Sequence, residues 1–388
     1  MITRGIQVDV TVRKREIDGQ IVEVPFCDHD CWSNDYRCPS AQSLARGRVV
    51  SNYAPAELLV RAVGNVDRGL RRRWPDGETE INLFGGNAAI HPDVLPMIST
   101  LSDKGYAVCL SMPGRRFLVD PEFGDKLVAA SLGVVAFSVD DIAAWEIDDL
   151  MRMTDRQLSL AYRQAGWRRG QKQKAVSAIY AAKVLQGWAV TVLFNVVVHP
   201  GNLLEIPQII ESLARHFPNV LINPFLAQSS FCGGDPIFGK EHVDGIIDLI
   251  ERMLAGSLPN TLDRPFYWST LQKAIQHQPD KFCWIMSGYA VWKCTHGRNP
   301  YVQIGRCPPG YSGEKYPGGY LNCFWNPHGR GTIQMWDASE ADVDEELASF
   351  GSPGCLGCIM PRLMFDRANT EAGLVVPAQH RNHERRTE

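Results

Sequence analysis

Residues 79–93 read TEINLFGGNAAIHPD, a short apolar run that ends at two glycines and leads into the start of a helix. A run of this length bounded by glycine is typical of a buried strand. The overlapping segment 91–104, HPDVLPMISTLSDK, repeats apolar side chains every three or four positions, as a helix with one buried face does. The stretch therefore predicts a strand and a helix that are joined by a glycine turn.

The same alternation continues in both directions along the chain. Apolar runs that we predict to be strands occupy residues 19–26, 79–86, 105–112, 133–140, 189–198 and 219–226. Helix-like segments such as 173–187 and 202–217 lie between them. Strand and helix repeated about six times favour parallel strands with crossover helices, here an α/β fold with a partial (β/α)6 barrel. In such folds the chemistry lies at the carboxyl ends of the strands.

The composition is that of a globular protein without a general affinity for polyanions. Of the 388 residues, 45% are hydrophobic, and 40 basic against 43 acidic residues give a formal charge of −3, which predicts no nucleic-acid or membrane partner. The basic runs 68–74 and 167–174 are interpreted as solvated helix surface, with a phosphate or carboxylate ligand as the alternative. We find no signal peptide and no bilayer-spanning stretch, and we expect a cytoplasmic protein.

The pattern also predicts how the chain divides into domains. An N-terminal segment (1–18) precedes the barrel (19–235), and a connecting helical region (236–275) follows it. Residues 276–365 are rich in Gly, Pro, Cys and aromatic side chains with little helical period, which indicates a small α+β cysteine-rich module. Residues 366–388 are predicted to be a polar tail.

Eleven cysteines in a chain that we expect in the cytoplasm are more typical of metal binding or catalysis than of disulfides. Cys27, Cys31 and Cys38 follow the strand predicted at 19–26, with the spacing C-x3-C-x6-C. Three thiolates can hold three irons of a [4Fe–4S] cluster and leave the fourth iron open to a ligand. The alternatives are a zinc site, which normally closes with four ligands, or thiols buried for packing.

This triplet, placed after the first strand of an alternating α/β chain, resembles that of the radical S-adenosylmethionine superfamily, although the common spacing there is C-x3-C-x2-C. Tyr36, an aromatic residue near the third cysteine, also fits. The resemblance implies that Cys27, Cys31 and Cys38 ligate a [4Fe–4S] cluster whose free iron chelates S-adenosylmethionine. It also implies reductive cleavage to a 5′-deoxyadenosyl radical that abstracts hydrogen from a substrate, with flavodoxin or ferredoxin as an external electron donor.

The same resemblance implies further contacts to the cofactor. Gly85 and Gly86 resemble the family's Gly-Gly-Glu-Pro turn, in which Asn87 and Ala88 replace the last two residues. An asparagine can still accept a hydrogen bond from the cofactor's ammonium group, but the charge-assisted contact is lost. Strand capping is the alternative for the other residues to which the family pattern points, namely Ser138, Asp140 and Asn195.

A second cysteine set lies near the carboxyl terminus. Cys307 and Cys323 bracket a glycine with the spacing C-x10-G-x4-C, and Cys355 and Cys358 follow as C-x2-C. Four thiolates make a complete metal site. The pattern resembles the SPASM and twitch modules of radical enzymes, which implies one auxiliary [4Fe–4S] cluster, and a four-cysteine zinc ribbon is the alternative. Cys283 and Cys294 are further candidate ligands. Cys109 and Cys232 are interpreted as buried core residues.

The resemblance implies an oxidoreductase or epimerase whose auxiliary cluster takes or relays an electron during oxidation, epimerisation or rearrangement. We expect a small hydroxylated or amino-bearing metabolite, of sugar, aminocyclitol or nucleoside type, because residues 1–18 are too few to grip a leader peptide. Modification of a ribosomally made peptide is the alternative, and a structural zinc protein is the alternative from another class. No acid or base is assigned, since a surface or capping role explains His91, His199 and Asp140 equally well.

Overall fold

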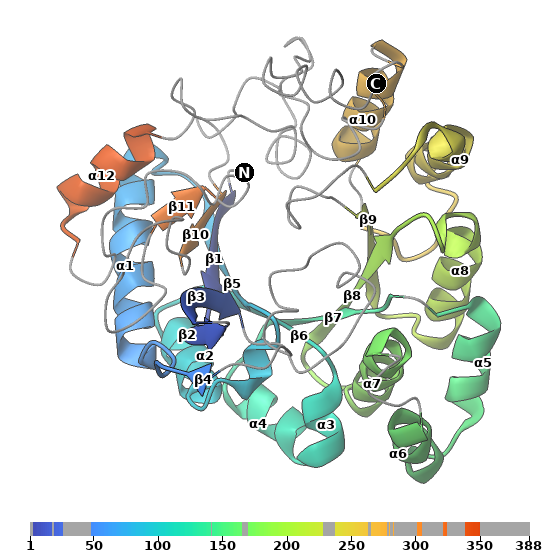
Figure 1. Ribbon diagram of the computed structural model, residues 1–388, viewed down its shortest axis with the longest axis horizontal. Coiled ribbons are helices and arrows are strands. Elements are labelled where there is room, and N and C mark those ends of the chain that lie inside the picture. Colours follow the sequence, from blue (N-terminus) through green and yellow to red (C-terminus); the bar gives the residue numbers. More distant parts are fainter. Residues whose placement is uncertain are drawn as a thin grey trace.

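The computed structural model describes residues 3–17, 19–25, 48–140, 142–164, 170–227, 237–262, 265–277, 279, 282, 301–304, 321–323 and 338–349 of the chain. Within these ranges the chain forms a curved, mostly parallel sheet whose connecting helices lie on its convex side (Figure 1). None of the helices in these ranges combines the length and the apolar composition that crossing a bilayer requires.

Eight strands in the described part of the chain form this curved sheet, in the order β11-β10-β1-β5-β6-β7-β8-β9. Neighbouring strands are parallel except for β10 and β11. The bounds are β1 Thr3–Asp9, β5 Glu78–Phe84, β6 Ala107–Met112, β7 Val134–Ser138, β8 Thr191–Val198, β9 Leu221–Leu226, β10 Tyr301–Ile304 and β11 Leu321–Cys323. The strands β1 and β5 to β9 confirm the predicted partial (β/α)6 barrel.

Each strand of the barrel has an apolar face and a more polar face. Ile6 and Val8 of β1, like Ile81 and Leu83 of β5, are fully buried on the side that the helices cover. Since side chains alternate along a strand, Gln7 of β1 lies on the opposite, concave side. Burying one such aliphatic side chain stabilises the fold by about 1.5–3 kcal/mol, so the apolar face is what holds the helices to the sheet.

Several of the helices are amphipathic in the way their sequences predict. Their bounds are α1 Ala56–Arg73, α2 Val94–Asp103, α3 Arg115–Val119, α4 Phe123–Ala129, α5 Ala144–Arg152, α6 Asp155–Gln164, α7 Gly170–Val184, α8 Ile206–His216, α9 Val243–Leu254 and α10 Pro265–His277. In α8, Ile209, Ile210 and Leu213 are buried on one face, and Pro207 occupies the first turn, where its missing N–H is not needed. The helices predicted within 91–104, 173–187 and 202–217 are confirmed as α2, α7 and α8.

One strand that the sequence pattern assigned to the barrel belongs to another sheet. Residues 19–26 contain β3 (Gln20–Pro25), which pairs antiparallel with β2 (Val12–Ile17) in a small sheet completed by β4 (Arg48–Val49). The first barrel strand is β1, within the predicted N-terminal segment 1–18. Because the concave face is polar, β1 alternates as TRGIQVD and lacks the continuous apolar run typical of a buried parallel strand.

Parts of the predicted C-terminal module are joined to the barrel. β10 is parallel to β1, and β11 pairs with β10, so two strands of the module extend the barrel sheet. The helix α12 (Glu340–Ser349) packs against α1 (Figure 1). Glu340 forms ion pairs with Arg68 and Arg72, and Asp344 forms ion pairs with Arg72 and Arg73. This basic run of α1 is therefore a docking surface for an acidic helix rather than a purely solvated face.

Candidate active site at the carboxyl edge of the sheet

The concave face of the sheet carries a row of polar side chains. Gln7 of β1 stands in register with Asn82 of β5. Further around the sheet, Ser138 of β7 stands in register with Asn195 of β8, which in turn stands beside Asn223 of β9. Parallel α/β folds bind their ligands at the carboxyl ends of the strands. We therefore take this polar face and the loops that follow the strands as the candidate active site.

The glycine pair after β5 is held by the loop that follows β1. Gly85 has a φ of +143°, and a Cβ on it would lie 2.1 Å from Thr11 Oγ1 and 2.7 Å from Asp9 Oδ1. Gly86 N donates a hydrogen bond to Thr11 Oγ1 at 3.1 Å, and Thr11 Oγ1 donates to Asp9 Oδ1 at 3.1 Å. Position 85 therefore accepts only glycine for reasons of internal packing. Both glycines remain partly exposed, which leaves their backbone accessible to a ligand.

Asn87 and His91 flank the short 3-10 helix Ala88–Ile90 that follows the glycine pair. Both residues are buried. Asp93 N donates to His91 Nδ1 at 3.1 Å, so Nε2 carries the proton and donates to Ala54 O at 3.1 Å. Burial lowers the pKa of His91, which keeps the ring neutral near pH 7. His91 thus ties this turn to the segment before α1, and both of its ring nitrogens are engaged in hydrogen bonds.

Asp140, which follows β7, is paired with a lysine from α7. Lys174 Nζ lies 2.7 Å from Asp140 Oδ2, and the carboxylate is fully buried. Val197 N lies 3.4 Å from Asp140 Oδ1 as a second donor. A buried carboxylate needs such partners because removing an ion from water is costly. The sequence pattern identified Asp140 but missed Lys174, since the two are 34 positions apart and nothing in the pattern links them.

Asn195 and Asn223 form a hydrogen-bonded amide pair on the concave face. Asn223 Nδ2 donates to Asn195 Oδ1 at 2.7 Å. Asn223 is 7% exposed, and its Oδ1 atom is buried without a hydrogen-bond partner in the described part of the chain. The sequence analysis identified Asn195 and missed Asn223, although an asparagine inside the apolar run LINPFL is a comparable signal.

Cys109 and Ser111 of β6 also lie on the concave side. Ser111 Oγ donates to Asn82 Oδ1 at 2.9 Å, which makes a second polar pair on this face. Cys109 is a free cysteine that keeps some exposed surface. Desolvation of the sulfur raises the pKa of its thiol to about 12. The thiol is therefore protonated at neutral pH.

Most of the predicted cluster ligands lie outside the described residues: Cys27, Cys31, Cys38, Cys307, Cys355 and Cys358, together with Cys232, Cys283 and Cys294. Cys323 is the last residue of β11 and pairs in register with Val302. Within the described ranges, no three His, Cys, Asp or Glu side chains gather as a metal site would require. The accessible glycine backbone and the buried, unpartnered oxygen of Asn223 fit a polar cofactor or substrate at the carboxyl edge of the sheet.

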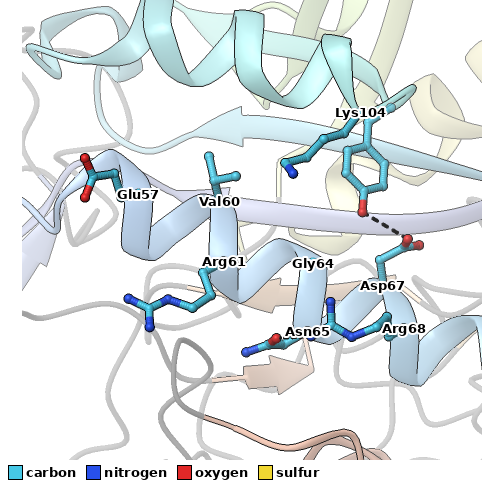
Figure 2. Close-up of a pocket in the computed structure, with 9 residues that line it drawn as sticks. Glu57, Val60, Arg61, Gly64, Asn65, Asp67, Arg68 and Lys104 are labelled. Carbon is cyan, nitrogen blue, oxygen red and sulfur yellow. Dashed lines mark hydrogen bonds between the residues drawn. The ribbon is translucent and has the colours of Figure 1, made fainter.

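A hollow of about 560 Å³ lies between α1 and the amino end of β6, at the opposite edge of the sheet (Figure 2). It is lined by Glu57, Val60, Arg61, Gly64, Asn65, Asp67, Arg68, Lys104 and Tyr106. Tyr106 Oη donates to Asp67 Oδ2 at 3.0 Å, and burial raises the pKa of Tyr106 to about 12. Arg68 is bound to Asn65 and to Glu340. Tyr106, Asp67, Arg68 and Asn65 already have hydrogen-bond partners, whereas the accessible glycine backbone and the unpartnered oxygen of Asn223 lie at the carboxyl edge, so we assign the active site to that edge.

Comparison with known proteins places the fold among solved structures. The chain matches no protein-family model, and no curated protein matches it. It is similar to the crystal structure of SuiB from Streptococcus suis bound to the precursor peptide SuiA, with a TM-score of 0.51 and 11% sequence identity. The match covers 93% of this chain and 70% of the SuiB chain. At this identity the similarity establishes a shared fold, the partial barrel of parallel strands described above.

Proposed function

We propose that the chain is a radical S-adenosylmethionine enzyme in which Cys27, Cys31 and Cys38 hold a [4Fe–4S] cluster. The observation that carries the proposal is the partial parallel barrel with a polar concave face, in a chain that also contains a cysteine triplet. A bound cluster of this kind supplies the electron that cleaves S-adenosylmethionine and so starts hydrogen abstraction from the substrate. The fold shared with SuiB supports this proposal.

The described residues would have distinct tasks in such a site. Gly85 and Gly86 would let the cofactor approach the backbone, and Asn87 and Ser138 would supply polar contacts to it. Asp140 would contact the cofactor as part of an ion pair, because Lys174 already balances the charge of its carboxylate. Apart from Lys174 of α7, these residues follow or belong to strands of the sheet, which keeps a site rigid.

For the substrate, a peptide is the better-supported class. We prefer this class because the structure of SuiB, which shares the fold, contains its bound precursor peptide. A small hydroxylated or amino-bearing metabolite is the second candidate, since the Asn82–Ser111 and Asn195–Asn223 pairs could hydrogen-bond to its hydroxyl or amino groups. In either case, Cys307, Cys323, Cys355 and Cys358 would hold an auxiliary [4Fe–4S] cluster that takes or relays an electron, with flavodoxin or ferredoxin as the external donor.

The test is anaerobic reconstitution followed by iron and sulfide analysis and an assay for 5′-deoxyadenosine with dithionite. We expect about eight irons per chain and cofactor cleavage. Replacing Cys27, Cys31 and Cys38 together by Ala should abolish cleavage and leave about four irons in the auxiliary site. Cys109→Ala is the matched control and should keep about eight irons, because its protonated thiol is not expected to bind metal.

Two results would contradict the proposal. Cleavage that survives in the triple variant would remove these cysteines from the reaction. A colourless protein that binds zinc and does not cleave S-adenosylmethionine would instead assign both cysteine sets to structural zinc sites. The substrate class is tested separately by mass spectrometry, comparing a short peptide encoded beside this chain with aminocyclitols and nucleosides as candidate substrates.

A further inference from the structure

The amide pair of Asn195 and Asn223 has hydrogen-bonding groups that the described part of the protein does not use. One bond, from Asn223 Nδ2 to Asn195 Oδ1 at 2.7 Å, joins the two side chains. This leaves Asn223 Oδ1 as an acceptor and Asn195 Nδ2 as a donor. Exchanging oxygen and nitrogen in both amides gives the same result, so the pair presents one acceptor and one donor in either orientation.

The burial of Asn223 Oδ1 indicates that this unused acceptor binds a ligand. Asn223 is 7% exposed, and its Oδ1 atom is shielded from solvent without a partner among the described residues. Buried polar atoms are almost always hydrogen-bonded, because an unmet one loses its bonds to water without replacement. Asn195 is only partly buried, so a ligand on the concave face can reach the pair from β8. An apolar residue at position 223 would serve packing better if no ligand were bound there.

We propose that Asn195 and Asn223 bind one backbone amide unit of an extended peptide substrate. This inference rests on the proposed function and names the substrate contact within the same site. Asn223 Oδ1 would accept from the peptide N–H, and Asn195 Nδ2 would donate to the peptide C=O.

The geometry of strands favours a peptide for this role. In an extended chain the N–H and C=O of one residue point to the same side, as they do when two residues exchange both hydrogen bonds in an antiparallel pair. The two asparagines stand in register on adjacent strands, about 4.8 Å apart in a parallel sheet. The pair thus places its donor and acceptor side by side, at a spacing comparable to that of the two groups in the peptide.

The first experiment tests whether Asn223 is unsatisfied, without any ligand. Asn223→Leu is compared with Asn202→Leu, because Asn202 is equally buried but uses both ends of its amide. Its Oδ1 accepts from His199 N at 2.8 Å, and its Nδ2 donates to Val197 O at 2.9 Å. We expect Asn202→Leu to lower the melting temperature at least about twice as much as Asn223→Leu. Equal losses would show that Asn223 is satisfied in the free protein and would overturn the proposal.

The second experiment uses the reconstituted holoenzyme with S-adenosylmethionine bound, and acetyl-Gly-Gly-Gly-amide as the probe. This peptide presents only backbone groups, and its affinity is measured by calorimetry beside that of myo-inositol. We expect Asn223→Leu to weaken the peptide about tenfold while Asn202→Leu leaves it within about twofold. The affinity for S-adenosylmethionine should change by less than about twofold in both variants.

The other outcomes are also decisive. A tenfold loss of S-adenosylmethionine affinity in Asn223→Leu would assign the pair to the cofactor and overturn the proposal. If Asn223→Leu weakens the binding of myo-inositol but not that of the peptide, the asparagine pair binds a hydroxylated metabolite, and the proposal is overturned. Absence of S-adenosylmethionine binding in the unsubstituted holoenzyme would refute the proposed function itself, and the stability comparison would still stand.

Discussion

At the two edges of the parallel sheet, the buried side chains of Arg4 and Asn223 differ in how completely their polar atoms are hydrogen-bonded. At the amino edge, the fully buried Arg4 donates to Thr79 Oγ1 at 2.9 Å and to three backbone carbonyls. Asp67 lies 4.0 Å from its Nε atom and balances the charge. At the carboxyl edge, Asn223 is also buried, but its oxygen has no partner in the described part of the chain.

The difference separates groups that serve the fold from groups that serve a ligand. A polar network that holds the structure together has to be complete, because each missing partner destabilises the folded state. A binding site has to keep donors and acceptors open for something that arrives later. Hydrogen-bond saturation therefore separates Arg4, which serves the fold, from Asn223, which we assign to a ligand, although both are buried polar side chains.

Arg4→Leu should have the largest effect on stability. It would remove every hydrogen bond of the guanidinium and leave Asp67 with Arg71, 2.7 Å away, as its remaining cation. We expect a loss of about 3 kcal/mol in the free energy of unfolding, measured with urea. Arg48→Leu, which breaks an exposed pair with Glu16, is the control and should lose less than about 1 kcal/mol. If the two variants lose similar unfolding free energy, the saturated hydrogen bonds of Arg4 do not stabilise the fold as proposed.

Gly85→Ala, a substitution at the carboxyl edge, should have an intermediate effect on stability. Its new Cβ would collide with Thr11, and its φ of +143° disfavours any side chain. We expect a loss of about 2 kcal/mol in unfolding free energy. Gly105→Ala is the matched control, because Gly105 has a φ of +83° and no heavy atom within 4 Å of the added carbon. If Gly105→Ala loses as much, the contact with Thr11 contributes nothing to the turn.

Arg72→Ala should have the smallest effect. Arg72 is 53% exposed and pairs with Glu340 and Asp344 of α12, so solvent and salt weaken each contact. We expect a loss of about 0.5 kcal/mol at low ionic strength and almost none in 1 M salt, measured by thermal unfolding. Arg152→Ala, which breaks a pair within α5, is the control for a contact that joins no two elements. A salt-independent loss would show that Arg72 acts through packing.

The sequence predicted the barrel well where strands follow the usual pattern. The runs containing β5 to β9 combine a buried apolar face with glycine or polar boundaries, and all five are confirmed as parallel neighbours. β1 was missed because its Arg4 and Gln7 are polar yet buried, so the apolar signal is confined to Ile6 and Val8. The pairing of β1 with β10 was missed because periodicity shows what a segment is and not which distant segment it joins.

The candidate site was predictable to a smaller extent. Gly85 lies in the predicted glycine turn, but the contact that requires glycine comes from Thr11, a residue of a different loop. Asn195 was identified, whereas its partner Asn223 and the lysine that pairs with Asp140 emerge only when strands and helices are placed together. The roles assigned to the cysteine sets stay predictions. Motifs identify single residues, and the partners of those residues depend on three-dimensional proximity.

The position of β1 between β5 and β10 also has a consequence for how the protein is made. During synthesis β1 emerges before the strands β5 to β9, while the neighbour on its far side, β10, emerges only after them. Until then, one row of backbone N–H and C=O groups on β1 has no strand to pair with, and exposed strand edges promote self-association. The nascent chain therefore carries an unpaired strand edge that is prone to self-association until β10 is made and pairs with β1.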